Sequence, residues 1–114
     1  MNLLSCPAAL GRAKDDIMMQ QFTEHTGIVL QDLICYREHP IDKMHILLEN
    51  KIPVIMVYGA VDDTVPYVEN GAILERYYRE NGGTIEVICK PDCGHHPHGL
   101  EDPTPIINFV EKYN

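Results

Sequence analysis

The feature that most constrains the fold of this chain is a near-continuous apolar run at residues 52–58. Such a run is typical of a strand buried on both faces in a parallel sheet, because a strand with one solvated face alternates polar and apolar residues. Residues 84–89 have the same strand character. Between the two runs, apolar residues at helical spacing over residues 68–81, closed by Asn81-Gly82-Gly83, predict a helix. The pattern therefore predicts an α/β fold with two parallel strands joined through a helix.

The rest of the chain predicts helices. A terminal helix is expected to begin beside Pro103 and Pro105, because proline is well tolerated in the first turn, and to run through Val110. Short amphipathic helices are predicted over residues 13–26, 30–38 and 41–50. We therefore divide the chain into a helical segment, residues 1–51, and a strand–helix–strand–helix segment, residues 52–114. An isolated pair of strands buries too little apolar surface to be stable. We therefore expect these two strands to be one part of a larger, doubly wound sheet.

Charge and hydropathy exclude several classes of partner. The formal net charge is −8 and the chain has no cluster of Lys or Arg, so we expect no nucleic-acid partner. No apolar run approaches the length that spans a bilayer, and we expect no membrane association. The N-terminal stretch lacks the basic region of a secretory signal, which favours a cytoplasmic protein. The alternative is a secreted parent protein with its signal upstream of this sequence.

Polar residues follow the first predicted strand at its carboxyl end. The loop at residues 59–66 fits the pattern G-x-x-D-x-x-V-P, with Asp62 three residues after Gly59. Reactive groups gather beyond the carboxyl ends of parallel strands, which makes Asp62 a candidate acid. Aspartate is also common in turns and at helix N-caps, because its carboxylate binds nearby backbone N–H groups. Taken alone, this loop favours the structural role.

The loop after the second predicted strand contains His95, His96 and His98. These residues have three interpretations: ligands of a metal ion together with Cys93 or Asp92, solvated loop histidines, or a general base. Adjacent histidines tend to point apart, and H-H-x-H lacks the i, i+4 spacing of common zinc motifs. We therefore expect no metal ion and no other cofactor.

The combination of the two loops favours the general base. A buried carboxylate fixes the tautomer of an imidazole and stabilises the imidazolium that forms when the ring accepts a proton. Neighbouring parallel strands would bring the two loops together, and the order Asp then His is that of the Ser–Asp–His triad of α/β-hydrolases. We therefore predict that Asp62 is the acid of a hydrolytic triad and that one of the three histidines, His95, His96 or His98, is its base.

Residues 52–110 resemble the last two strands and helices of the α/β-hydrolases, through the G-x-x-D-x-x-V-P loop and the Gly94-His95 pair. The resemblance implies a doubly wound sheet and hydrolysis of a small-molecule ester. It implies that Asp62 is the acid, with Asp63 a less well-spaced alternative, and that His95 is the base, because the family's base commonly follows a glycine. The string GHHPHGL looks like a bacterial subgroup of esterase-like hydrolases, some associated with carbohydrate esters.

The same resemblance assigns a role to the helical segment. It corresponds to the region where these enzymes carry helices that cover the active site. Under this interpretation the wall or lid residues include Met18, Met19, Phe22, Leu33 and Ile34. The alternative is that these side chains only face a core.

The chain departs from the family at the nucleophile. The elbow G-x-S-x-G is absent, and the neighbours of Ser5, the only serine, do not form one. No cysteine lies at a strand-to-helix elbow either. We therefore expect a fragment of a serine hydrolase, carrying acid and base but inactive alone. The alternative is a non-catalytic interaction module that pairs with another chain, or with itself, through an exposed sheet edge.

Overall fold

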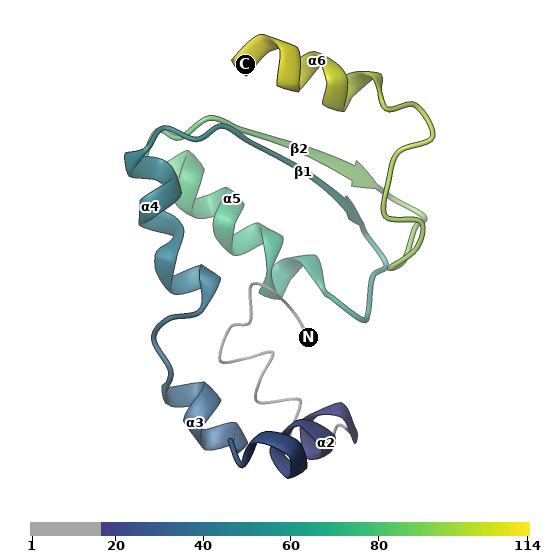
Figure 1. Ribbon diagram of the computed structural model, residues 1–114. Helices are drawn as coiled ribbons and strands as arrows, with labels where there is room; N and C mark the ends of the chain where they lie inside the picture. Colours follow the sequence, from purple (N-terminus) through teal and green to yellow (C-terminus); the bar gives the residue numbers. More distant parts are fainter. Residues whose placement is uncertain (1–16) are drawn as a thin grey trace. The chain divides into compact units, whose positions relative to one another are not determined.

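The computed structural model describes residues 17–114 and divides the chain into two compact units, one ending at Lys43 and the other spanning Met44–Asn114 (Figure 1). Ser5, Cys6 and the first residues of the predicted helix 13–26 lie outside the described part. The division falls earlier than the expected boundary between residues 51 and 52, because α4 (Met44–Glu49) contacts α5 and belongs to the second unit.

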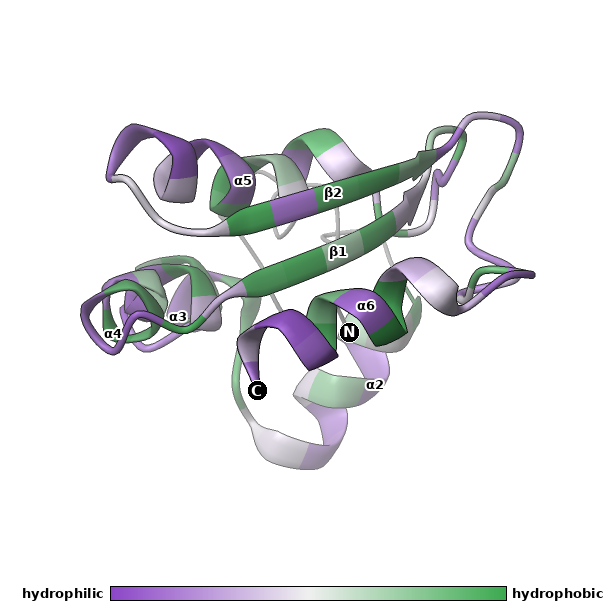
Figure 2. Cartoon of the chain, turned by 90° about the horizontal axis from the view of Figure 1, so that it is seen from above, coloured by the Kyte–Doolittle hydropathy of each residue, from purple (hydrophilic) through white to green (hydrophobic). Residues whose placement is uncertain are grey.

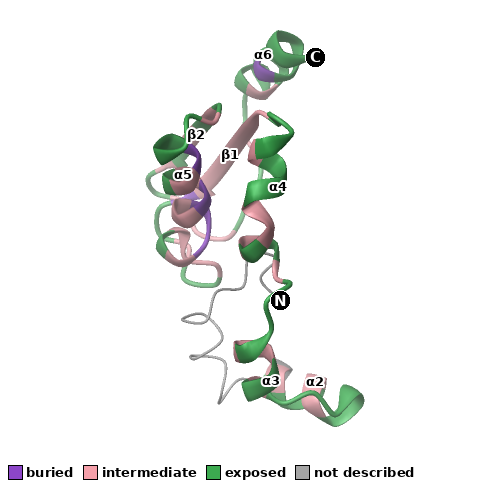
Figure 3. Cartoon of the chain, turned by 90° about the vertical axis from the view of Figure 1, so that its left-hand side faces the viewer, coloured by how far each residue is buried: buried purple, intermediate pink, exposed green. Residues whose placement is uncertain are grey.

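Short helices make up the described part of the first unit: α2 (Ile17–Thr26), α3 (Leu30–Cys35) and the 3-10 turn η2 (Pro40–Lys43). Gly27 follows α2 with a φ of 74°, a conformation that favours glycine. At the start of α3, the Asp32 carboxylate accepts the backbone N–H of Val29 over 2.9 Å. No described residue of this unit is buried, as Figure 3 shows. Local hydrogen bonds rather than a core therefore define these helices.

The second unit contains a two-stranded parallel sheet and its flanking helices. After α4, the order is β1 (Val54–Gly59), the 3-10 turn η3 (Tyr67–Glu69), α5 (Gly71–Glu80), β2 (Ile85–Lys90) and α6 (Thr104–Tyr113). The strands pair in register from Val54 opposite Ile85 to Gly59 opposite Lys90. The prediction of a mixed α/β chain with two parallel strands and a helix between them is confirmed.

The two faces of the sheet carry different helices. Figure 1 shows α5 and α6 on opposite sides of the strands. On the α6 side, Lys112 lies 3.7 Å from the carboxylate of Glu86 on β2. On the α5 side, Met56 approaches the first residue of α5, Gly71. Because side chains alternate along a strand, the apolar residues of β1 divide between the two faces. Figure 2 shows β1 apolar over most of its length and paler at its carboxyl end.

The core of the described residues is small. Its buried apolar side chains are Leu74, Tyr78 and Phe109, and only Tyr78 is fully buried. Leu74 and Tyr78 are one helical turn apart on α5 and therefore lie on the same face of this helix. The Tyr78 hydroxyl donates to the carbonyl oxygen of Ile52 over 2.9 Å. The residues of β1 before Gly59 are only half-buried, so this unit covers its most apolar strand incompletely.

The predicted end of α5 is also confirmed. The backbone N–H of Asn81 donates to the carbonyl of Tyr77 over 3.2 Å, and that of Gly83 donates to Tyr78 over 2.8 Å. Gly82 has a φ of 73°, which a side chain would disfavour. Among the described residues, no helix combines the length and apolar character that crossing a membrane requires.

Candidate functional site

The site begins where β1 ends, at Gly59. A Cβ atom at this position would lie 2.3 Å from the carbonyl oxygens of both Cys93 and Gly94. Those two residues belong to the loop after β2, so this loop packs directly against the last residue of β1. Only glycine allows so close an approach of two backbones.

Backbone hydrogen bonds join the two loops at this point. The N–H of Ala60 donates to the carbonyl of Lys90 over 3.0 Å, and the N–H of Val61 donates to the carbonyl of Cys93 over 3.1 Å. The loop after β2 is therefore fixed to the loop after β1 by main-chain groups. Side chains carried by these loops are held at the same edge of the sheet.

Asp62 uses its two carboxylate oxygens for different purposes. Oδ1 accepts the backbone N–H groups of Thr64 and Val65 over 3.0 and 2.8 Å. Oδ2 lies 3.1 Å from Nδ1 of His95. The turn role and the acid role, which the sequence presents as alternatives, are thus compatible. The backbone contacts orient the carboxylate, and the other oxygen faces the imidazole.

The electrostatics of the pair favour an ionised carboxylate. The side chain of Asp62 is 13% exposed and that of His95 is 35% exposed. Burial tends to raise the pKa of Asp62, but the hydrogen bond from Val65, the hydrogen bond and charge attraction from His95, and the hydrogen bond from Thr64 outweigh it. The pKa of the Asp62 carboxyl is therefore lower than its ordinary value, and Asp62 is ionised near neutral pH.

This contact assigns the tautomer of His95. An ionised carboxylate can only accept a hydrogen bond, so Nδ1 of His95 must carry the proton. In the neutral ring, Nε2 then holds a free lone pair, the state required of a general base or of a metal ligand. The structure thus brings together the two residues that the sequence predicts as acid and base. Asp63 is exposed and makes no hydrogen bond to His95 in the described part of the chain.

The loop after β2, residues 91–103, is called the histidine loop below. Lys90, the last residue of β2, holds this loop at a second point. Its ammonium group donates to the carbonyl oxygens of Pro97 and of Gly99, the latter over 3.0 Å. Sequence reasoning missed this role. The only available signal was the position of a lysine at a strand end, followed by a loop rich in glycine and proline.

The three histidine rings of this loop lie close together. The ring centroid of His95 is 5.0 Å from that of His96 and 4.8 Å from that of His98, while His96 and His98 are 4.3 Å apart. His95 is half-buried, and the other two are exposed. Adjacent histidines were expected to point apart, but here they form one cluster.

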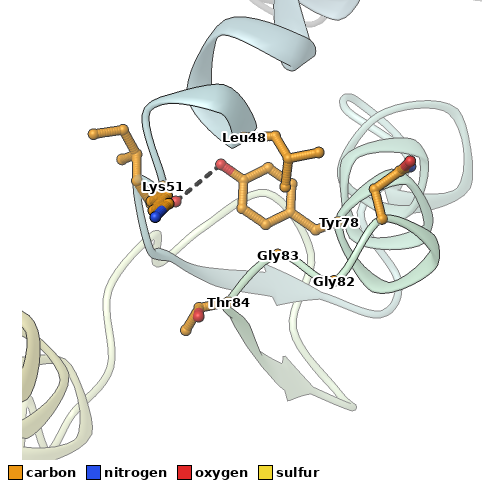
Figure 4. Close-up of a pocket in the computed structure, with 8 residues that line it drawn as sticks. Leu48, Lys51, Tyr78, Gly82, Gly83 and Thr84 are labelled. Carbon is orange, nitrogen blue, oxygen red and sulfur yellow. Dashed lines mark hydrogen bonds between the residues drawn. The ribbon is translucent and has the colours of Figure 1, made fainter.

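A pocket of about 370 Å³ lies at the other end of the strands, near their first residues (Figure 4). Its lining residues are Leu48, Lys51, Ile52, Tyr78, Asn81, Gly82, Gly83 and Thr84. Figure 4 shows the Tyr78 hydroxyl bonded to the chain just before β1. Because this pocket is at the opposite end of the strands from Asp62 and His95, it is separate from the candidate pair.

The structure does not test two further expectations, that the chain lacks a nucleophile and that its helical segment carries lid residues. Ser5 lies outside the described residues, and residues 17–114 contain no serine. Of the predicted lid side chains, Met19, Phe22, Leu33 and Ile34 are half-buried, while the side chain of Met18 is outside the described part. Their role stays a prediction.

No protein-family model, no curated protein and no solved structure matches this chain.

Proposed function

We propose that Asp62 and His95 are the acid and base of a serine-hydrolase triad of the α/β-hydrolase type, acting on a small-molecule ester. The observation that carries this proposal is the 3.1 Å contact between Asp62 Oδ2 and His95 Nδ1, made at the carboxyl ends of two parallel strands. This contact supports the resemblance of residues 52–110 to the α/β-hydrolases. The exposure of His95 fits a base that must reach a substrate.

Each residue has a defined task in such a reaction. His95 Nε2 removes the proton of a serine hydroxyl as the serine oxygen attacks the ester carbonyl. Asp62 stabilises the imidazolium that results and keeps the ring oriented. The imidazolium then returns the proton to the departing alcohol, which leaves an acyl-enzyme for water to hydrolyse through the same base.

The nucleophile belongs to a part of the protein other than residues 17–114. Those residues contain no serine, and Ser5 has no elbow sequence around it. The incomplete burial of β1 supports a larger sheet, because its apolar side chains would be covered by further elements. We therefore propose that β1 and β2 are the last two strands of a doubly wound sheet, and that the 114 residues alone are inactive.

The test is to express the chain with its upstream coding sequence, which the proposal expects to contain an in-frame G-x-S-x-G. The longer protein should hydrolyse p-nitrophenyl acetate and react with a fluorophosphonate probe. Asp62→Asn should lower kcat by about 10⁴-fold, as loss of the acid does in other triads. The matched control is Asp63→Asn, which should stay within about twofold of the parent because Asp63 does not contact His95.

Two results would contradict the proposal. One is equal activity of the parent protein and Asp62→Asn. The other is fluorophosphonate labelling of the 114-residue chain that disappears in Ser5→Ala, since this would place the nucleophile at a serine without an elbow.

A second candidate function is a non-catalytic interaction module. In the part of the chain that the structure describes, each strand has one neighbour, so each keeps an edge that can pair with another strand. Large apolar side chains, including Ile107 and Val110 on α6, are exposed. This function predicts a dimer in size-exclusion chromatography with light scattering, whereas a monomer at high concentration would argue against self-pairing.

The remaining expectations on partners and location belong to the same proposal. A net charge of −8 supports a protein that binds neither nucleic acid nor membrane surfaces. We propose a cytoplasmic location, with secretion of a longer parent protein as the alternative. Fractionation of cells that express the full coding sequence distinguishes the two.

A further inference from the structure

The cluster of His95, His96 and His98 has a use that ester hydrolysis does not require. One ring nitrogen from each residue can be chosen so that all three lie within 4.8 Å of one another. A triad needs one imidazole, and the hydrolytic role leaves His96 and His98 unexplained. Three imidazoles in one place are the ligand set preferred by divalent ions of the zinc class.

The Asp62 contact makes His95 a suitable ligand. Histidines that bind metals usually donate their second ring N–H to a carboxylate, which fixes the ring and increases the basicity of the coordinating nitrogen. Asp62 Oδ2 takes this position at Nδ1 of His95, so Nε2 remains as the coordinating atom. The contact between Asp62 and His95 is therefore compatible both with a general base and with a metal ligand.

The distances are compatible with a site that closes on an ion. Zn²⁺ binds histidine nitrogens at about 2.0–2.1 Å in a tetrahedral arrangement, which places the nitrogens about 3.4 Å apart. The three ligand nitrogens, which lie within 4.8 Å of one another, must therefore come closer by up to roughly 1.4 Å. His96 and His98 are exposed, so their rings can turn without disturbing a core. Lys90 meanwhile holds the loop that carries them.

We propose that His95, His96 and His98 bind one divalent transition-metal ion of the zinc class, with Asp62 orienting His95 from behind. Three protein ligands leave a fourth position for water. The bound ion occupies Nε2 of His95, which is the atom that a triad uses to accept a proton. The metal-bound and general-base states of His95 therefore exclude each other.

The metal site goes beyond the proposed function, and the experiment that tests the metal site does not require hydrolase activity. Zn²⁺ is titrated into the 114-residue chain by calorimetry in the presence of a non-coordinating reductant. We expect one equivalent to bind to the wild-type chain. His96→Asn and His98→Asn should each weaken the affinity by about tenfold or more, because each removes one of three ligands.

Three further variants separate this site from other sources of binding. Asp62→Asn should weaken the affinity by about 10–100-fold, the usual effect of losing the partner of a ligating histidine, while Asp63→Asn should not. His45→Asn removes an exposed histidine on α4 and should change nothing. Cys93→Ser should also bind as the wild type does, which shows that the neighbouring thiol is not a ligand. Circular dichroism of each variant confirms that it is folded.

The outcomes distinguish this site from the hydrolase. Affinity that is unchanged in both His96→Asn and His98→Asn, or that is lost in Cys93→Ser, overturns the metal site and leaves the Asp62–His95 pair intact as acid and base. A longer protein that fails to react with fluorophosphonate, while the 114-residue chain still binds one Zn²⁺ through the three histidines, contradicts the hydrolase and supports the metal site.

Discussion

The two ends of the β1–β2 sheet each place a glycine where a side chain cannot fit, but different groups fill the space. At the end where the strands begin, a Cβ on Gly83 would lie 2.5 Å from the ring of Tyr78 and 2.7 Å from the side chain of Leu48. At the end where the strands finish, a Cβ on Gly59 would meet the backbone carbonyls of Cys93 and Gly94, both at 2.3 Å.

This difference separates a region that stabilises the unit from one that sets the geometry of the candidate site. Side chains such as Tyr78 form the small core, and they contribute free energy of folding through burial. Backbone carbonyls beside Gly59 bury little apolar surface, but they fix the path of the histidine loop relative to Asp62. Variants near Gly83 and Tyr78 should therefore reduce the stability of the unit. Variants at Gly59 should instead separate Asp62 from His95.

The largest effect is expected for Tyr78→Ala. Removing a buried aromatic ring typically costs about 3–5 kcal/mol, and the core of the unit Met44–Asn114 contains few other buried side chains. We expect the cooperative urea transition, followed by circular dichroism, to move to much lower urea or to disappear. A loss below about 1 kcal/mol would contradict the assignment of this end as the core.

Gly59→Ala should have an intermediate effect on stability and a large one on the site. Overpacking costs about 1–3 kcal/mol, and here the atoms in the way are backbone that cannot rotate aside. The matched controls are Gly94→Ala, where the nearest atom is 3.7 Å away, and Gly99→Ala, which has open space. The free energy of unfolding of both controls should stay within about 0.5 kcal/mol of the wild-type value in the same urea titration. Equal losses of stability at all three positions would show that the backbone contacts at Gly59 have no special role.

Lys90→Met should lower the free energy of unfolding by about 1 kcal/mol or less, because it removes hydrogen bonds that are partly open to solvent. The side chain keeps its apolar length but can no longer hold the carbonyls of Pro97 and Gly99. We expect faster amide exchange in residues 91–103, with β1 and α5 unchanged. Unaltered exchange in the loop would show that the close contact at Gly59 and the backbone hydrogen bonds of Ala60 and Val61 position it without Lys90.

The smallest effect concerns Glu75 on α5 and is measured as a change in how stability depends on pH in the acid range. The hydrogen bond from Tyr67 and then that from Arg79 lower the pKa of Glu75 below its ordinary value of 4.5. A lowered folded-state pKa adds stability that is present above the unfolded value and is lost as the pH falls through the folded value. Glu75→Gln should therefore flatten the decline in stability below about pH 4.5. Identical acid unfolding curves for both proteins would contradict this.

Much of the fold could be predicted because its signals are local. The apolar run at residues 52–58 and the Asn81-Gly82-Gly83 stop indicate β1 and the end of α5 within one residue or two. The pairing of Asp62 with His95 could also be predicted, since neighbouring parallel strands place their following loops at one edge. The strands, the helix between them and the meeting of the two loops need periodicity and chain order alone, whereas the choice of His95 among the three histidines rests on the resemblance to the α/β-hydrolases.

Other features depend on contacts that spacing does not encode. The predicted helix over residues 30–38 ends earlier, at Cys35, because Tyr36 adopts an extended conformation with ψ of 139°. The start of α5 is delayed to Gly71 by the 3-10 turn η3. The rings of His95, His96 and His98 cluster although adjacent residues were expected to diverge, because the loop is irregular and is shaped by Gly59 and Lys90.

The proposed triad requires that Asp62 fix the imidazole of His95 with its proton on Nδ1. Long-range ¹H–¹⁵N NMR spectra of the metal-free chain, recorded at a pH where the ring is neutral, report the tautomer of each histidine directly. We expect His95 to carry its proton on Nδ1 in the wild type and in Asp63→Asn, and to lose this preference in Asp62→Asn. A His95 ring protonated on Nε2 in the wild type, or the same spectrum in Asp62→Asn, would contradict it.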